Sequence, residues 1–134
     1  MREILFRGKR EDNGEWIEGY LVRRPSAIQE GKHYSPWAID RPPKDPDDSG
    51  EVCFVDGDTV GQFTGLTDKN GRKIFEGDVV RYPWMALAKI QYDEEHACFF
   101  VEGQSWIEAV DGYSEKNSEV VGNVHDNPEL LEVQ

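Results

Sequence analysis

The sequence predicts a mainly β fold, either a partly closed antiparallel barrel or a strongly bent sheet, with a short C-terminal helix. Short apolar stretches recur along the 134 residues and are separated by turn signals rich in Gly, Asp and Asn. The clearest run is residues 61–82, GQFTGLTDKNGRKIFEGDVVRY. Asp68 and Gly71 begin and end a four-residue turn there, because an Asp carboxylate accepts backbone N–H groups ahead of it and Gly adopts positive φ without steric cost. We therefore expect a hairpin here, followed by a third strand after Gly77.

The N-terminal segment predicts two strands. Ile4–Phe6 is a short apolar run typical of a strand buried on both faces, and Trp16–Val22 has apolar residues on both alternations. Asp12–Gly14 forms the turn between them. Residues 13–22 resemble residues 70–82 with one residue inserted. We favour similar turn chemistry reached twice over an internal duplication, because two short matches do not establish a repeat.

The middle of the chain is less regular. Pro36 interrupts Tyr34–Ile39, which favours an edge strand or an extended loop. Asp40–Gly50 holds three prolines and four aspartates in eleven residues, so we expect a long surface loop that packs no core, and the composition is compatible with poor order. Glu51–Val55 then predicts a strand, and Asp56–Asp58 a turn into the central run.

The C-terminal part predicts a hairpin, a strand and a helix. Pro83–Leu87 fits either one helical turn or a loop, and residues 89–92 and 97–101 form a hairpin over the polar turn 93–96. Residues 119–124 predict the last strand. Asn127 as N-cap and Pro128 at the first helical position start a short helix through Leu131.

Length and composition favour one domain over residues 1–134, with a loop insertion at about 40–50. The two cysteines have no CxxC spacing, and the N-terminus shows no secretory signal, so a reduced cytoplasmic protein is expected. No apolar run approaches the roughly 20 residues that span a bilayer, which excludes a membrane partner.

The net charge of −12 is concentrated in the last third of the chain. Residues 93–134 hold eleven carboxylates against one lysine, which gives −10. Such residues keep a small domain soluble, or they form a surface that meets a basic partner. The candidate acidic interaction surface comprises Asp93, Glu94, Glu95, Glu102, Glu108, Glu129 and Glu132.

No catalytic, cofactor or metal site is predicted. His125, Asp126 and Asn127 lie in a turn where Asp and Asn cap backbone groups, and His96 beside Glu94 and Glu95 is explained equally by a solvated hairpin tip. Asp78 after Gly77 is interpreted as a carboxylate that ties down a turn. Ser35 near His33, and the cysteines Cys53 and Cys98 with a histidine, lack the context of an activated nucleophile.

Three long segments carry a family resemblance. FRGKREDNGEWIEGYLV, VGQFTGLTDKNGRKIFEGDVVRY and VVGNVHDNPELLE resemble the YopX family of small phage and prophage proteins, over Phe6–Glu132. The resemblance implies a phage or prophage origin and a mostly β fold. It implies no activity and no catalytic residue.

The function hypotheses follow from these observations. The first is an accessory protein that acts by binding, through self-association or a protein partner, without catalysis. The second is an acidic mimic of nucleic acid that occupies a host DNA-binding protein, and the third is a hydrolase or nuclease with a hidden site. Direct nucleic-acid binding is disfavoured by the net charge. We expect three tryptophans to be partly buried and to pack at the edge of the core, with a partner-binding surface as the alternative: Trp37, Trp84 and Trp106.

Overall fold

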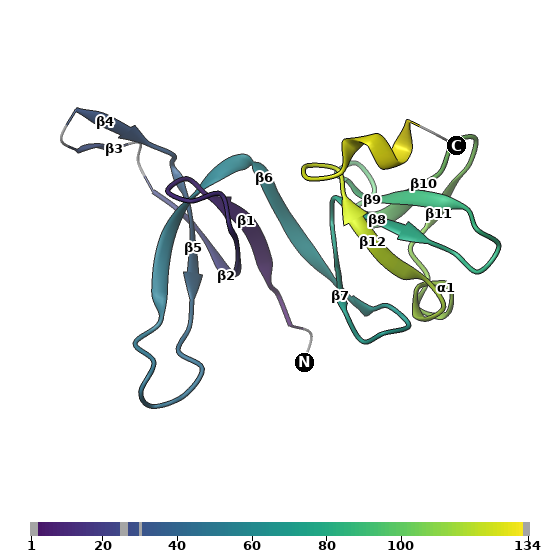
Figure 1. The fold of residues 1–134 in the computed structure, drawn as a ribbon, viewed down its shortest axis with the longest axis horizontal. Coiled ribbons are helices and arrows are strands. Elements are labelled where there is room, and N and C mark those ends of the chain that lie inside the picture. The colour runs from purple at the N-terminus through teal and green to yellow at the C-terminus, as the bar shows by residue number, and fades with distance from the viewer. Residues whose placement is uncertain (1–2, 25–26, 30, 133–134) are drawn as a thin grey trace. The chain divides into compact units, whose positions relative to one another are not determined.

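The computed structural model describes residues 3–24, 27–29 and 31–132 and confirms the mainly β prediction. Its two larger antiparallel sheets hold most of the strands, and one of them is partly ring-closed without being a barrel (Figure 1). The chain divides into two compact units, Met1–Gln62 and Phe63–Gln134.

The first unit is a ring of four strands with a small extra hairpin. Antiparallel neighbours follow the order β1, β2, β5 and β6, and β1 pairs with β6 as well, which closes the ring. The strands are β1 (Phe6–Arg10), β2 (Trp16–Arg23), β5 (Trp37–Arg41) and β6 (Glu51–Thr67), and the hairpin is β3 (Ala27–Gln29) with β4 (Lys32–Tyr34). Ile17, Ile39, Cys53 and Val55 form the buried core.

Two predictions for the first unit were wrong. Ile4 precedes β1 and is 51% exposed, so the short apolar run at the N-terminus is not a buried strand. β5 is a central strand between β2 and β6 rather than an edge strand or loop. Pro36 does not disturb it because the strand begins at Trp37, and the Pro36 carbonyl accepts a hydrogen bond from Arg24 N (2.6 Å).

β6 is one strand where the sequence predicts a strand, a turn and another strand. The pairing of β1 with β6 shifts register between Arg7 and Lys9, which pair with Gly61 and Asp56, so residues 57–60 form an irregularity within β6. The Thr59 hydroxyl donates to Asp56 O (2.6 Å) and accepts from Lys9 N (2.9 Å), which satisfies the backbone at the irregularity. β6 then continues without interruption from the first unit into the second.

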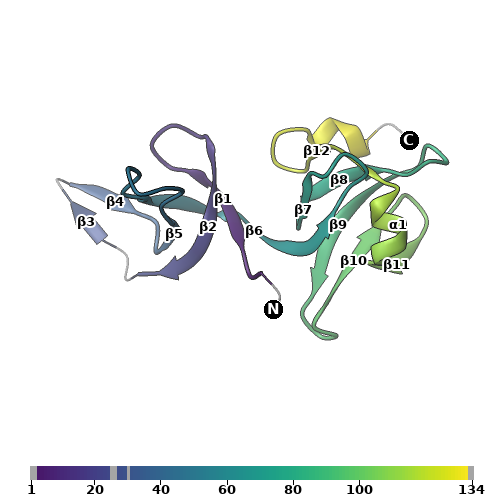
Figure 2. The same ribbon diagram turned by 90° about the horizontal axis from the view of Figure 1, so that it is seen from below.

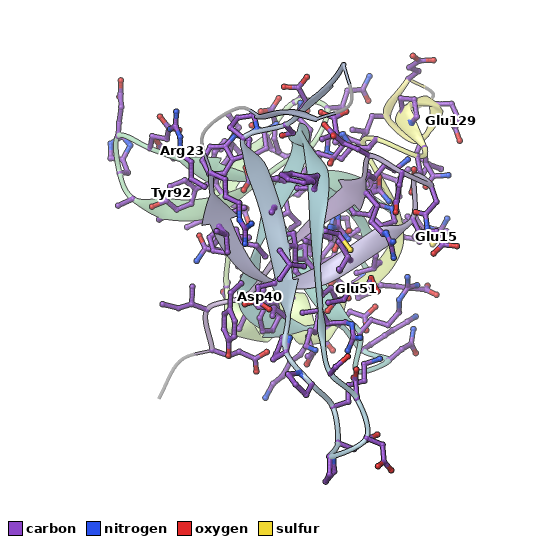
Figure 3. All side chains as sticks on the ribbon, turned by 90° about the vertical axis from the view of Figure 1, so that its left-hand side faces the viewer. Glu15, Arg23, Asp40, Glu51, Tyr92 and Glu129 are labelled. Carbon is purple, nitrogen blue, oxygen red and sulfur yellow. The ribbon has the colours of Figure 1, made fainter. Side chains whose placement is uncertain are left out.

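The loop between β5 and β6, residues 42–50, has its own hydrogen bonds, and it is shorter than predicted because Asp40 and Arg41 belong to β5. Arg41 forms an ion pair with Asp48 (2.7 Å), and the Asp48 carboxylate also accepts from Lys44 N and Gly50 N. These bonds hold the pKa of Asp48 well below its usual range. Figure 3 shows Asp40 and Glu51 at the base of this loop, where β5 ends and β6 begins.

The two similar sequence segments do not fold alike. β2 runs straight through Gly19, where an added Cβ would lie 2.1 Å from Asp40 O. The corresponding Gly77, with φ 92, lies in a turn that separates two strands. The shared residues therefore reflect similar local chemistry and not a repeated structural unit.

The second unit is a five-stranded antiparallel sheet in the order β11, β10, β9, β8 and β12 (Figure 2). Its elements are β7 (Lys73–Phe75), which pairs with the end of β6, β8 (Asp78–Arg81), β9 (Leu87–Asp93), β10 (Cys98–Glu102), β11 (Ile107–Ala109), α1 (Gly112–Lys116), β12 (Glu119–Asn123) and the 3₁₀ helix η1 (Pro128–Leu131). Its buried core is Ile74, Val80, Tyr82, Ala88, Ile90, Val101 and Val120.

Two buried carboxylates fix the turns at the start of this unit. Gly71 has φ 80 and donates to Asp68 O (3.0 Å), as the sequence predicts. The Asp68 carboxylate accepts from Asn70 N, Arg72 N and Val120 N, each at 2.9 Å. Asp78 accepts from Phe75 N (2.8 Å), in agreement with its structural interpretation.

The predicted short C-terminal helix is confirmed as η1, a single 3₁₀ turn that begins at Pro128 and ends at Leu131. Only the capping role was wrong, because Asn127 makes no capping bond with its side chain. Its Oδ1 accepts instead from Asn123 N (3.3 Å), which ties the turn back to β12.

Candidate functional site

A solvent-exposed turn of the second unit joins β8 to β9. Tyr82 N donates to Ala86 O and Met85 N donates to Tyr82 O, both at 2.9 Å, so Pro83, Trp84 and Met85 form a three-residue hairpin loop. Such a loop ends in a left-handed residue, and Met85 has φ 69. Glycine is favoured there, and a larger side chain costs about 1–2 kcal/mol. The turn therefore keeps a large apolar side chain at a position that local energetics disfavour.

Residues 83–85, which we name the Trp84 tip, present two large apolar side chains to solvent. Trp84 is 64% exposed and Met85 is 71% exposed. Trp84 nevertheless has a fixed orientation, because its ring stacks on Tyr82 with centroids 4.8 Å apart and an interplanar angle of 4°. One face of the indole is thus held against the protein.

Tyr82 is itself anchored in the core. It is 3% exposed, and its hydroxyl donates to Glu115 Oε1 (2.7 Å) in α1. Ser118 Oγ donates to Glu115 O (2.8 Å) and lies 3.4 Å from Oε2. Burial raises the pKa of Glu115, and the bonds from Tyr82 and Ser118 offset only part of that rise. The Trp84 tip therefore rests on a buried tyrosine–glutamate pair.

A cleft of about 420 Å³ adjoins the Trp84 tip. It is lined by Lys69, Arg81, Tyr82, Pro83, Met85, Asn117 and Glu119. Lys69 Nζ lies 3.6 Å from Glu119 Oε2, so these two charges offset each other. Within the part of the chain that the structure describes, the side chain of Arg81 has no hydrogen bond, ion pair or ring contact, although its backbone pairs in the sheet. The cleft therefore combines apolar walls with one uncompensated guanidinium.

The sequence-predicted acidic residues occupy several places in the second unit. Asp93 ends β9, and its carboxylate accepts from Glu95 N (2.9 Å) and contacts His96 Nδ1 (2.6 Å). Glu94 and Glu95 are exposed in the following turn, and Glu129 and Glu132 are exposed in and just after η1.

Pairing places two of the acidic residues on opposite faces of the sheet. Glu102 pairs with Lys89 in β9, whereas Glu108 pairs with Val101. Directly paired residues share a face and successive residues alternate, so Glu102 and Glu108 point to opposite sides. The set is not brought together at this edge.

The other candidate residues are occupied by structural bonds. His125 N and Asp126 N donate to the Asn123 side chain, and Ser35 Oγ accepts from Trp37 N (3.0 Å). Among the described residues, no three His, Cys, Asp or Glu side chains are grouped so that they hold a metal ion. The side chain of His33 lies outside the described part of the chain.

The two cysteines differ in environment. Cys53 is buried, and its Sγ donates to Glu51 Oε1 (3.1 Å). Burial and this bond raise the pKa of the Cys53 thiol to about 11, which disfavours the reactive thiolate. Cys98 is exposed at the start of β10.

The three tryptophans of uncertain role also differ in how far they are buried. Trp37 packs against the first core with Arg23 over its ring at 5.2 Å, and Trp106 packs against the second core, 5.9 Å from Tyr82. Both agree with packing at the edge of the core. Trp84 is the exposed member of the set, which fits the alternative interpretation.

The comparisons with known proteins establish the family. A family model described as YopX protein matches residues 5–132. The chain belongs to the YopX family. This family member is similar to the solved structure titled "Crystal structure of protein EF1440 from Enterococcus faecalis", with a TM-score of 0.55 and 23% identity over 98% of this chain and 99% of that one. At that identity the likeness concerns the fold alone. No curated protein matches the sequence.

Sequence reasoning missed the residues of the cleft. Arg81 and Glu119 become neighbours through the pairing of β8 with β12, across 38 positions of sequence, and Lys69 and Asn117 come from two further turns. No local spacing signals that assembly. In the described part of the chain, no helix has the length and apolar character needed to cross a membrane.

Proposed function

We propose that this YopX protein acts without catalysis, by binding a protein partner through the Trp84 tip and the adjoining cleft. The observation that carries the proposal is the exposed indole of Trp84, held in place by its stack on Tyr82. A rigid, exposed aromatic residue loses little conformational entropy when a partner covers it, and such residues dominate protein interfaces.

The surroundings of Trp84 support the same proposal. Met85 adds a flexible apolar side chain, a type that adapts to the shape of a partner. The turn accepts a strained backbone at this position in order to present that side chain. The buried bond from Tyr82 to Glu115 restricts the aromatic stack from below. These features together make the Trp84 tip a pre-organised binding surface beside the cleft.

The alternatives gain less support from the geometry. An acidic mimic of nucleic acid needs carboxylates along one face, and Glu102 and Glu108 point to opposite faces. A net charge of −12 disfavours approach to phosphates. The similarity to phage and prophage proteins directs the search for a partner to a bacterial host.

The test is site-specific photo-cross-linking. A photoreactive amino acid at position 85 is expected to give a discrete adduct in host lysate, and Trp84→Ala is expected to abolish it. Trp84→Phe, which keeps a stacked ring, should restore part of the adduct. A second probe at Ile107, which is also exposed (65%), serves as the matched control. An adduct with a second copy of the chain would identify the partner as self. Equal labelling at positions 85 and 107, independent of Trp84, would contradict the proposal.

A further inference from the structure

We infer that the cleft beside the Trp84 tip takes a carboxylate that an apolar peptide segment of the partner carries. The inference rests on the proposed function and names the chemistry of what binds there. It starts from Arg81, which is one of the residues that line the cleft.

The cation of Arg81 is available, although a carboxylate lies nearby. Arg81 and Glu119 are directly opposite each other in β8 and β12, the arrangement that favours a cross-strand ion pair. Glu119 instead lies 3.6 Å from Lys69 Nζ. Lys69 thus compensates Glu119, and the guanidinium of Arg81, with its five donors, keeps no side-chain partner among the described residues. A planar guanidinium binds a carboxylate through two parallel hydrogen bonds, which is the strongest match for this group.

The charge around the cleft favours one negative group over several. Residues 63–134 carry fourteen Asp and Glu against six Lys and Arg, a formal −8. A ligand with several phosphate charges is repelled by that field, and Glu119 lies on the lining itself. A single carboxylate needs a single cation, which Arg81 supplies.

The other residues that line the cleft indicate which groups flank the carboxylate in the bound segment. Pro83 and Met85 offer an apolar wall, and Asn117 adds a polar residue to the lining. A volume of about 420 Å³ lies within the usual range of small-ligand pockets, so the cleft has room for a side chain and its neighbours. The geometry therefore suits a short segment in which an acidic residue is flanked by apolar ones.

The experiment is an NMR titration of the ¹⁵N-labelled full chain with capped pentapeptides. The probe peptide has a central glutamate flanked by leucines with glycine at each end, and the matched peptide has glutamine in place of glutamate. We expect saturable shifts of Arg81 Nε–H and the Asn117 side-chain amide, with at least about tenfold tighter binding of the glutamate peptide, since one charged hydrogen-bonded pair gives that ratio.

Variants separate the role of Arg81 from general charge. Arg81→Gln is expected to reduce binding of the glutamate peptide to the level of the glutamine peptide, and Arg81→Lys to give an intermediate value because its ammonium is a point charge. Lys73→Gln removes the same charge from an exposed residue that does not line the cleft, and it should leave binding unchanged. Melting curves of all three should match that of the parent protein.

Several results would overturn the inference. Equal affinity for both peptides would do so, as would tighter binding of inorganic phosphate or ADP, which would make the cleft a phosphate site. No saturable shift up to about 10 mM peptide would also do so, because even a weak ion pair with apolar contacts is detectable there. If a Trp84-dependent adduct forms and is unaffected by Arg81→Gln, the inference fails while the proposed function stands. If no such adduct forms, the proposed function fails whatever the peptides do.

Discussion

Replacement of Asp68 by Asn tests how much one buried carboxylate stabilises the second unit. Asp68 is 4% exposed and accepts three backbone N–H groups. Asn70 and Arg72 are exposed, so water replaces part of what their N–H groups lose. The bond to Val120 N is buried, and an amide nitrogen placed opposite it would leave a donor facing a donor. We expect a loss of about 2–4 kcal/mol in the free energy of unfolding, from roughly 1–3 kcal/mol for the buried donor and a smaller sum for the turn.

The effect of Asp68→Asn should depend on pH. Burial raises the pKa of the Asp68 carboxyl, but the hydrogen bonds from Val120, Arg72 and Asn70 outweigh it, so the pKa lies below the unfolded value of 3.8. The stabilisation is therefore complete above pH 3.8 and is lost as pH falls through the lower folded pKa, where parent and variant converge.

Urea denaturation at several pH values and amide exchange at Val120 measure both effects. Asp56→Asn is the matched control, because Asp56 is exposed and its carboxylate accepts from Asp58 N. A difference below about 0.5 kcal/mol at pH 7, the size expected of an ordinary surface substitution, would refute the reasoning. So would a large difference that does not decrease at all as the pH is lowered below 3.8.

The remaining predictions concern a second carboxyl, a glycine and the β5–β6 loop. Glu115→Gln should raise stability at pH 7. Burial raises the pKa of Glu115 above its unfolded value of 4.5, so the stabilisation by this carboxyl is full below pH 4.5 and is lost as pH rises through the folded pKa. A urea midpoint no higher than that of the parent protein would contradict this. Gly71→Val should cost about 1–3 kcal/mol from positive φ alone, since nothing lies within 4 Å of its added Cβ, and Gly71→Asn should cost less; equal midpoints would disprove the strain. Replacement of residues 42–50 by a short Gly and Ser linker should preserve cooperative thermal unfolding, because the hydrogen bonds described for this loop stay within residues 41–50. Loss of the transition would show that the loop supports the fold.

Local chemistry was predictable and long-range pairing was not. The Asp68 turn follows from four consecutive residues, so its geometry was correct, whereas the bond from Val120, 52 positions away, left no trace in the pattern. The apparent turn at residues 56–58 became part of an irregularity within β6 because β1 pairs with β6 on both sides of it, which only the tertiary fold decides.

The candidate site shows the same division. Trp84 was open to two interpretations because the spacing of apolar residues around it fits neither a helix nor a strand. Its exposure depends on the three-residue loop that ends at Met85. The anchor beneath it joins Tyr82 to Glu115 across 33 positions, and α1, which supplies Glu115, has five residues and no sequence signal that we recognised.

The continuity of β6 limits how the gene can be recombined. Gln62 and Phe63 are consecutive residues of one strand, so no linker separates the two units. A crossover that replaced one unit with that of a relative would have to rejoin β6 in register. A shift of one residue would turn every later side chain of the strand to the opposite face and expose its buried alternation. Chimaeras between YopX relatives should therefore fold when the crossover in β6 preserves strand phase, and the two units should be inherited together.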